Sequence, residues 1–175
     1  MIKTLSIAVA AAVAVLLLYA AARPDSFRVE RSVRIRATPE QIFPYIVDLR
    51  RFNTWNPFAR KDPALSGQYG AVTVGNGASY AWTSDRIGSG RMEITGFDQP
   101  SQVTMKLDFL KPFEAHNVAE FTLRPDGDAT VVTWAMHGQS PYLGRLVQVF
   151  FSMDKMVGGD FEAGLGNLKA LAQAH

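Results

Sequence analysis

The sequence contains no cysteine and only three histidines. The lack of cysteine excludes disulfide bridges, thiolate catalysis and zinc sites with cysteine ligands. Histidine is the side chain that ordinarily titrates near neutral pH, so general acid-base groups are few. The alternation of the surrounding strands places His116 and His137 on outward faces, away from the apolar side chains. No catalytic residue is therefore assigned.

The sequence also has little net charge, with 18 Lys and Arg against 16 Asp and Glu, or +2 in total. A nucleic-acid-binding domain shows a much larger basic excess on one face, so no nucleic acid is expected as a partner. The motifs of zinc metalloproteases, α/β-hydrolases and P-loop proteins are missing too. We therefore predict no metal and no cofactor.

One long apolar run is present at the N-terminus, where every residue from Leu5 to Ala22 except Ser6 is apolar or Tyr. As a helix this run measures about 27 Å, close to the ~30 Å of a bilayer core. We predict that residues 1–23 are a transmembrane anchor and that 5–22 lie in the membrane. The alternative is a secretory signal cleaved after the small residues at 20–22, but the run is longer than the apolar part of most signals.

Basic residues are unequally placed around this run, and their distribution predicts its orientation. Lys3 precedes the run, whereas several arginines follow it. Because basic flanks stay on the cytoplasmic side, we expect a single-pass protein with a cytoplasmic domain. A cleaved signal would instead export the domain. The flanking arginines are Arg23, Arg28, Arg31, Arg34 and Arg36.

Residues 24–175 form one predicted α+β domain. Short helices are expected between Pro39 and Asn53, with breaks near Pro44 or Asp48, because proline is favoured at the first helical position. A helix-period pattern runs from Leu143 to Ala172. Between these helices, and before them, apolar and polar residues alternate with a period of two, which predicts strands of a curved antiparallel sheet. The six or seven strands are expected at 27–36, 71–74, 78–84, 90–97, 102–110, 114–124 and 129–137.

The C-terminal helix pattern contains an unusual number of glycines, at 158, 159, 164 and 166. Each costs about 1 kcal/mol relative to alanine in a helix interior. Either the helix breaks near Gly158 and Gly159, or close neighbours occupy the space that side chains would fill. The sequence leaves both alternatives open.

Four segments together resemble the START-like superfamily, also called SRPBCC, in its polyketide cyclase/dehydrase-like branch with an N-terminal membrane segment. They are "VERSVRIRATPEQIFPYIVDLRRFNTWNPF" (29–58), "GNGASYAW" (75–82), "ATVVTWAMHG" (129–138) and "MDKMVGGDFEAGLGNLK" (153–169). The resemblance implies a helix-grip fold, a sheet wrapped around a long C-terminal helix. It also implies a deep apolar cavity between sheet and helix, used across the superfamily for lipids, sterols, polyketides or plant hormones, and for chemistry in a minority of members.

The predicted function is the binding of a hydrophobic small molecule or lipid in this cavity, at or near a membrane. The alternatives are a polyketide cyclase/dehydrase-like enzyme acting on an apolar substrate and a domain that binds a protein partner or client. The oligomeric state stays open. Inward-facing aromatic and methionine side chains suit an adaptable apolar pocket, although a filled core explains the same pattern. The candidate ligand-binding residues are Trp55, Phe58, Tyr80, Trp82, Met92, Met105, Leu107, Phe109, Asn117, Trp134, Met136, Phe150, Val157 and Phe161.

Two of the candidates raise separate questions. Trp55 lies in the stretch "NTWNPF", where Pro57 forces a turn, and it either closes one end of the cavity or caps the core. Asn117 shares a strand face with apolar residues, as does Arg31. A buried amide or charge needs a partner. Each of the two either sits at the edge of the sheet, pairs with an acid such as Asp154 or Asp160, or meets a polar headgroup of the ligand.

Overall fold

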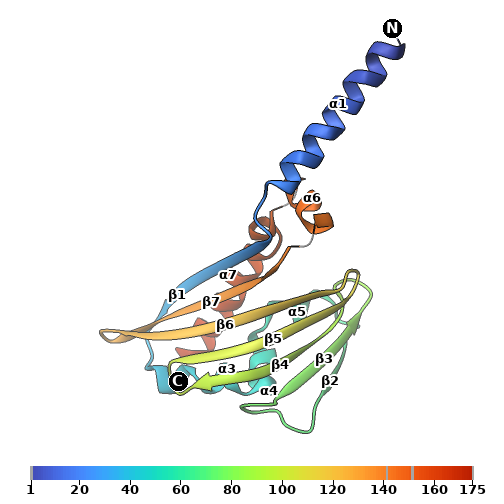
Figure 1. Cartoon of the computed structure of the whole chain (residues 1–175). Helices are drawn as coiled ribbons and strands as arrows, with labels where there is room; N and C mark the ends of the chain where they lie inside the picture. The colour runs from blue at the N-terminus through green and yellow to red at the C-terminus, as the bar shows by residue number, and fades with distance from the viewer. Residues whose placement is uncertain (1, 141, 151, 175) are drawn as a thin grey trace.

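The computed structural model describes the backbone of residues 2–140, 142–150 and 152–174, and the side chains of these residues except 2, 3, 5, 8, 143, 147, 148 and 150. Figure 1 shows a curved sheet, a C-terminal helix lying against it, and an N-terminal helix that projects from one end. This N-terminal helix, α1, spans Ile2–Ala21. Within the described part of the chain, no helix is long and apolar enough to cross a membrane, so the predicted span is not supported.

The sheet has seven strands in the order β1-β7-β6-β5-β4-β3-β2, and every neighbouring pair is antiparallel. From β2 to β7 each strand pairs with the next along the chain, and β1 pairs with β7. This arrangement confirms the predicted α+β class and strand number. The strands are β1 (Ser26–Ile35), β2 (Ser66–Tyr69), β3 (Ser79–Ser84), β4 (Gly88–Asp98), β5 (Gln102–Lys111), β6 (Ala115–Asp126) and β7 (Ala129–Gln139).

The strand predicted at 71–74 is wrong, and β2 lies earlier in the chain. The segment makes other hydrogen bonds instead: the Thr73 carbonyl accepts from Leu49 N and Gly75 N donates to the Val47 carbonyl. Val74 forms one isolated bridge with Asp48. Backbone groups paired with the helical segment in this way cannot also form a continuous ladder with a strand.

Four short helices connect β1 to β2, and the breaks between them have local causes. Proline stands at the first position of three of them, where its missing N–H costs nothing. The remaining helix begins after Asp48, whose carboxylate accepts hydrogen bonds from Arg50 N and Arg51 N, as an N-cap does. The helices are α2 (Pro39–Ile42), α3 (Pro44–Val47), α4 (Leu49–Trp55) and α5 (Pro57–Lys61).

The C-terminal helical pattern forms two helices, α6 (Tyr142–Phe150) and α7 (Met153–Ala172), where the sequence predicts one. Ser152 ends the connection and caps α7 by accepting a hydrogen bond from Lys155 N at 3.3 Å. Helix α6 contacts α1, and the Tyr142 hydroxyl donates to the Leu17 carbonyl at 3.1 Å. Helix α7 packs mainly on β1 and continues unbroken through its glycines.

Two of the α7 glycines make room for close neighbours, which answers the question the sequence leaves open. A Cβ atom on Gly158 would overlap the Arg31 guanidinium group. A Cβ atom on Gly164 would lie 2.8 Å from the Trp134 ring and 2.9 Å from Pro57. Gly166, by contrast, has open space where its side chain would be. Close packing therefore requires glycine at 158 and 164 but not at 166.

We expect Gly164→Ala to lower the free energy of unfolding by about 1–3 kcal/mol, because Trp134 and Pro57 must move. Gly166→Ala is the matched control in the same helix, and we expect it to raise the free energy of unfolding by up to about 1 kcal/mol through helix propensity. Urea unfolding of both variants measures the difference. If both variants changed the free energy of unfolding by the same amount in the same direction, the packing explanation would be contradicted.

Arg31 connects β1 to α7 by two ion pairs, to Asp154 at 2.8 Å and to Glu162 at 2.6 Å. Of the alternatives left open by the sequence, pairing with an acid is the one observed: Asp154 is a partner, whereas Asp160 pairs with Lys61. The hydrogen bond from Arg31 lowers the pKa of Asp154 below its ordinary value. A carboxylate with a lowered folded pKa stabilises the fold above its unfolded pKa of about 3.9, and this contribution disappears as the pH falls through the folded pKa.

Arg31→Met is expected to reduce the acid sensitivity of the fold, because Asp154 then titrates at a similar pH in the folded and unfolded states. The measurement is urea unfolding at pH 7 and at pH 3. The decline in unfolding free energy between the two should be smaller in the variant than in the unchanged protein. An identical decline would show that the ion pair contributes nothing to the pH dependence.

Candidate functional site: an apolar cavity

A cavity of about 240 Å³ lies between the inner face of the sheet and α7. Strands β3 to β7 supply one wall, α7 supplies another, and α4 and α5 complete it. The strand residues in the wall are almost all apolar and aromatic. They are Tyr80, Trp82, Met92, Met105, Leu107, Phe109, Ala119, Phe121, Trp134 and Met136.

Strand register explains why these side chains meet. Tyr80 pairs with Met92, and Met92 pairs with Leu107, so three neighbouring strands present them side by side on the same face. Trp82 lies over Gly90, where a Cβ atom would come within 2.6 Å of the indole ring. The alternation of each strand thus produces one continuous apolar wall.

Aromatic rings close the inner end of the cavity. Trp134 from β7 stacks on Phe161 from α7 with ring centroids 4.2 Å apart and an angle of 6° between the planes. Phe121 lies 5.1 Å from Trp134, and Phe52 meets both rings edge to face. These contacts fix the distance between sheet and helix on this side of the cavity.

Most of the residues predicted from the sequence do line the cavity. From the helices these are Phe58, Val157 and Phe161. From the strands they are Tyr80, Trp82, Met92, Met105, Leu107, Phe109, Trp134 and Met136.

Trp55 is not in the cavity wall. Its side chain is fully buried, and its indole Nε1 donates to the Tyr45 carbonyl at 2.8 Å. The ring packs edge to face on Phe52 and Phe121 behind the wall. Of the two interpretations, capping of the core is therefore the one that the structure supports, because the ring is fully buried among other rings and does not line the cavity.

Asn117 is also absent from the wall. It is buried beside Gly138, where a Cβ atom would overlap its side-chain oxygen. On β6, Asn117 pairs with Gly138 of β7 and with Leu107 of β5, and its side-chain oxygen lies against Gly138 instead of lining the cavity. The side chain of Phe150, the remaining candidate, lies outside the described residues.

An ion pair stands at the mouth of the cavity, where Lys61 Nζ lies 2.6 Å from Asp160. Lys61 also lies over the ring of Phe58, 5.2 Å from its centroid. Met156, at 56% exposure, marks the open side.

Deeper in the cavity, burial raises the pKa of the Tyr80 hydroxyl, which keeps it neutral. The cavity therefore has a charged rim and an uncharged interior.

Several wall residues are not among the sequence candidates. Ala119 and Phe121 follow from the alternation of β6, and Met156 from the helical spacing of α7. Asp160 also lies on α7, but as a charged residue it stands outside the apolar pattern. The others come from loops and short helices, where no periodic pattern marks the inward side. The full set is Phe52, Asn56, Ala59, Lys61, Leu65, Ile87, Ala119, Phe121, Met156 and Asp160.

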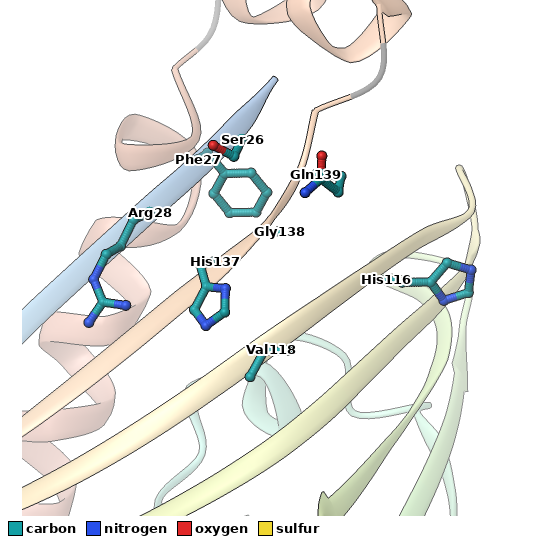
Figure 2. A pocket seen from close by; sticks show the side chains of 8 residues that line it. All are labelled: Ser26, Phe27, Arg28, His116, Val118, His137, Gly138 and Gln139. Carbon is teal, nitrogen blue, oxygen red and sulfur yellow. The ribbon is translucent and has the colours of Figure 1, made fainter. Parts of the chain in front are cut away.

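A second hollow, an open groove of about 520 Å³, lies at the end of β1, β6 and β7. Figure 2 shows Arg28 beside His137, with His116 farther along the neighbouring strand. His116 is exposed and His137 is half-buried, and neither lines the apolar cavity. Hydrogen bonds from Lys106 and His116 lower the pKa of Asp108. This groove is open to solvent and has a mixed polar and apolar lining, whereas the cavity wall is mostly apolar, so the cavity is the stronger candidate site.

Comparison with known proteins agrees with this geometry. Residues 26–173 match the family described as polyketide cyclase / dehydrase and lipid transport. The chain belongs to this family. The match covers the sheet and α7 and begins after α1. It confirms the family predicted from the sequence, but the N-terminal membrane segment lies outside the matched residues.

Several solved structures share the fold at low sequence identity. Protein Ms6760 from Mycobacterium smegmatis is 16% identical, with a TM-score of 0.59 over 84% of this chain and 91% of that one. Protein CV1439 from Chromobacterium violaceum is 13% identical, with a TM-score of 0.59 over 86% and 99%. DynU16, from the dynemicin biosynthetic locus, is 18% identical, with a TM-score of 0.57 over 87% and 49%. No curated protein matches the chain.

Proposed function

We propose that this protein binds a hydrophobic small molecule or lipid in the cavity between sheet and α7. The observation that supports this proposal most directly is an enclosed wall of aromatic, methionine and aliphatic side chains around open space. Such a wall releases water when an apolar ligand enters, which favours binding. The family description, which includes lipid transport, is consistent with it.

The volume of the cavity limits the size of the ligand. The cavity measures about 240 Å³. This is below the roughly 300–1,000 Å³ of pockets that enclose drug-sized molecules. A compact apolar molecule or part of one acyl chain fits, whereas a complete two-chain lipid does not. Met92, Met105 and Met136 give the wall some freedom to adapt.

The rim suggests how such a ligand lies. Lys61 and Asp160 offer a charged donor and acceptor at the mouth, and the interior offers apolar surface. Burying a polar group without a hydrogen-bond partner is unfavourable. A ligand with one polar end would therefore place that end at the rim and its apolar part inside.

Association with a membrane through residues 5–22, with the domain on the cytoplasmic side, remains part of the proposal. It is supported by the apolar composition of the run and by exposed apolar side chains along α1. Extraction of membranes with alkaline carbonate, followed by N-terminal sequencing of the mature chain, separates a retained anchor from a cleaved signal and an exported domain. The exposed side chains are Ile7, Val9, Val13, Val15, Leu17 and Leu18.

The experiment for ligand binding is a fluorescence titration of purified residues 24–175 with N-phenyl-1-naphthylamine, an uncharged apolar probe. We expect saturable binding with one probe per chain, and native mass spectrometry should detect a co-purified apolar molecule. A linear, unsaturable response together with an empty protein in native mass spectrometry would refute the proposal.

A further inference from the structure

The tip of the β5–β6 hairpin exposes two large apolar side chains. Phe113 is 80% exposed and Leu110 is 60% exposed, although they lie only three residues apart. Neither belongs to the hydrophobic core or packs on its edge among the described residues. Lys111 is exposed between them. Apolar surface concentrated at a hairpin tip is unfavourable in water and indicates a contact surface.

A second exposed aromatic, Phe97, differs from this tip. It lies at the opposite end of β4 from the cavity mouth, and its exposure is only 43%. Its ring packs on Phe43 with centroids 6.0 Å apart. Phe97 therefore already has a partner within the fold. Phe113 has no such ring contact in the part of the chain that the structure describes.

The hairpin tip lies at the same end of the domain as α1 and the cavity mouth. The start of β6 is beside the end of β7, since Asn117 pairs with Gly138, and β7 leads into α6, which contacts α1. Ile87, in the neighbouring β3–β4 turn, lines the cavity, as does Met156 in the first turn of α7. Figure 1 shows α1 leaving the domain from this end, with the β6–β7 turn at the far end.

We propose that the tip formed by residues 110–114 docks on a lipid bilayer and holds the cavity mouth at its surface. Phenylalanine and leucine insert into the region between headgroups and acyl chains. Lys111 and Glu114 together give the tip no net charge, so the two apolar side chains carry the proposed docking. The apolar α1 leaves the same end, so both elements can reach one membrane. Docking does not depend on ligand binding in the cavity. Where the proposed function holds, it lets an apolar ligand pass between bilayer and cavity without crossing water.

The absence of cysteine makes a direct test possible, because one introduced cysteine is the sole labelling site. Glu114→Cys in the full chain is labelled with an environment-sensitive dye and mixed with vesicles of phosphatidylcholine and phosphatidylglycerol. We expect the dye emission to shift to shorter wavelength and to be quenched at least twofold by lipids with a nitroxide near the headgroup. Gln99→Cys, in the β4–β5 turn at the opposite end, is the control and should show neither change.

A third labelled variant distinguishes insertion of the hairpin tip from binding of the chain to the vesicles by another surface. Glu114→Cys combined with Leu110→Ser and Phe113→Ser keeps the dye position but removes the apolar side chains, and the quenching should disappear. Three results would each overturn the proposal. The dye at position 114 could show no shift, the dye at position 99 could be quenched equally, or the quenching at 114 could persist after Leu110 and Phe113 are replaced. Probe binding by the cavity is measured separately, so its failure cannot be confused with failure of docking.

Discussion

Replacing Ala119 by phenylalanine is expected to weaken binding of an apolar probe at least tenfold. Ala119 lies on β6 with its side chain in the cavity wall, and it is buried. Phenylalanine adds a six-carbon ring, which takes up a large part of the cavity of about 240 Å³. Because the ring enters open space, we expect a stability cost of no more than about 1–3 kcal/mol. The titration with N-phenyl-1-naphthylamine measures the loss.

Leu123→Ala is the matched control, on the same strand and the same face but outside the cavity wall. Removing this buried side chain should lower the free energy of unfolding by about 2–5 kcal/mol and leave the probe affinity of the folded protein unchanged. Comparing the two variants distinguishes weaker probe binding caused by a filled cavity from weaker binding caused by a less stable fold. Undiminished binding by a folded Ala119→Phe protein would show that the ligand site lies elsewhere.

Trp55→Ala is expected to cause the largest loss of stability, about 3–5 kcal/mol. The substitution removes a fully buried ring, its contacts with Phe52 and Phe121, and the hydrogen bond to the Tyr45 carbonyl. Urea unfolding measures the change. The probe affinity of the remaining folded protein should change little, because Trp55 is separated from the cavity by its neighbours.

Trp55→Phe serves as the control for the ring itself, since it keeps most of the packing and leaves the Tyr45 carbonyl without its donor. We expect it to cost about 1–3 kcal/mol, less than the alanine variant. A Trp55→Ala protein that stays stable but loses the probe would instead restore the interpretation of this side chain as a plug of the cavity.

The sequence predicts the cavity wall well where the chain is periodic. Alternation along β3 to β7 places Tyr80, Met105 and Trp134 inward, and the structure brings them together as expected. It fails where no pattern marks the inward side. Lys61 and Asp160 are 99 residues apart in the sequence, and nothing local in the sequence predicts that they form an ion pair.

Errors in the predicted elements have similar causes. The helical spacing of apolar residues in the sequence continues across residues 151–152, so this spacing does not predict that α6 and α7 are separate helices. Strand β2 contains Gly67 and Gln68, which carry no alternating pattern. Trp55 stands next to a proline-induced turn, and an aromatic there packs equally well inside a core or beside a void. Tertiary neighbours decide such positions.

Photo-crosslinking tests the central claim, binding of an apolar ligand in the cavity, most directly. The purified protein is irradiated with an alkyl diazirine of about eight carbon atoms, with and without excess N-phenyl-1-naphthylamine, and the modified peptides are identified by mass spectrometry. We expect modification that the competitor prevents, on peptides containing Met105, Trp134 or Met156. Modification confined to the groove around His116 and His137, or modification that the competitor does not reduce, would contradict the account.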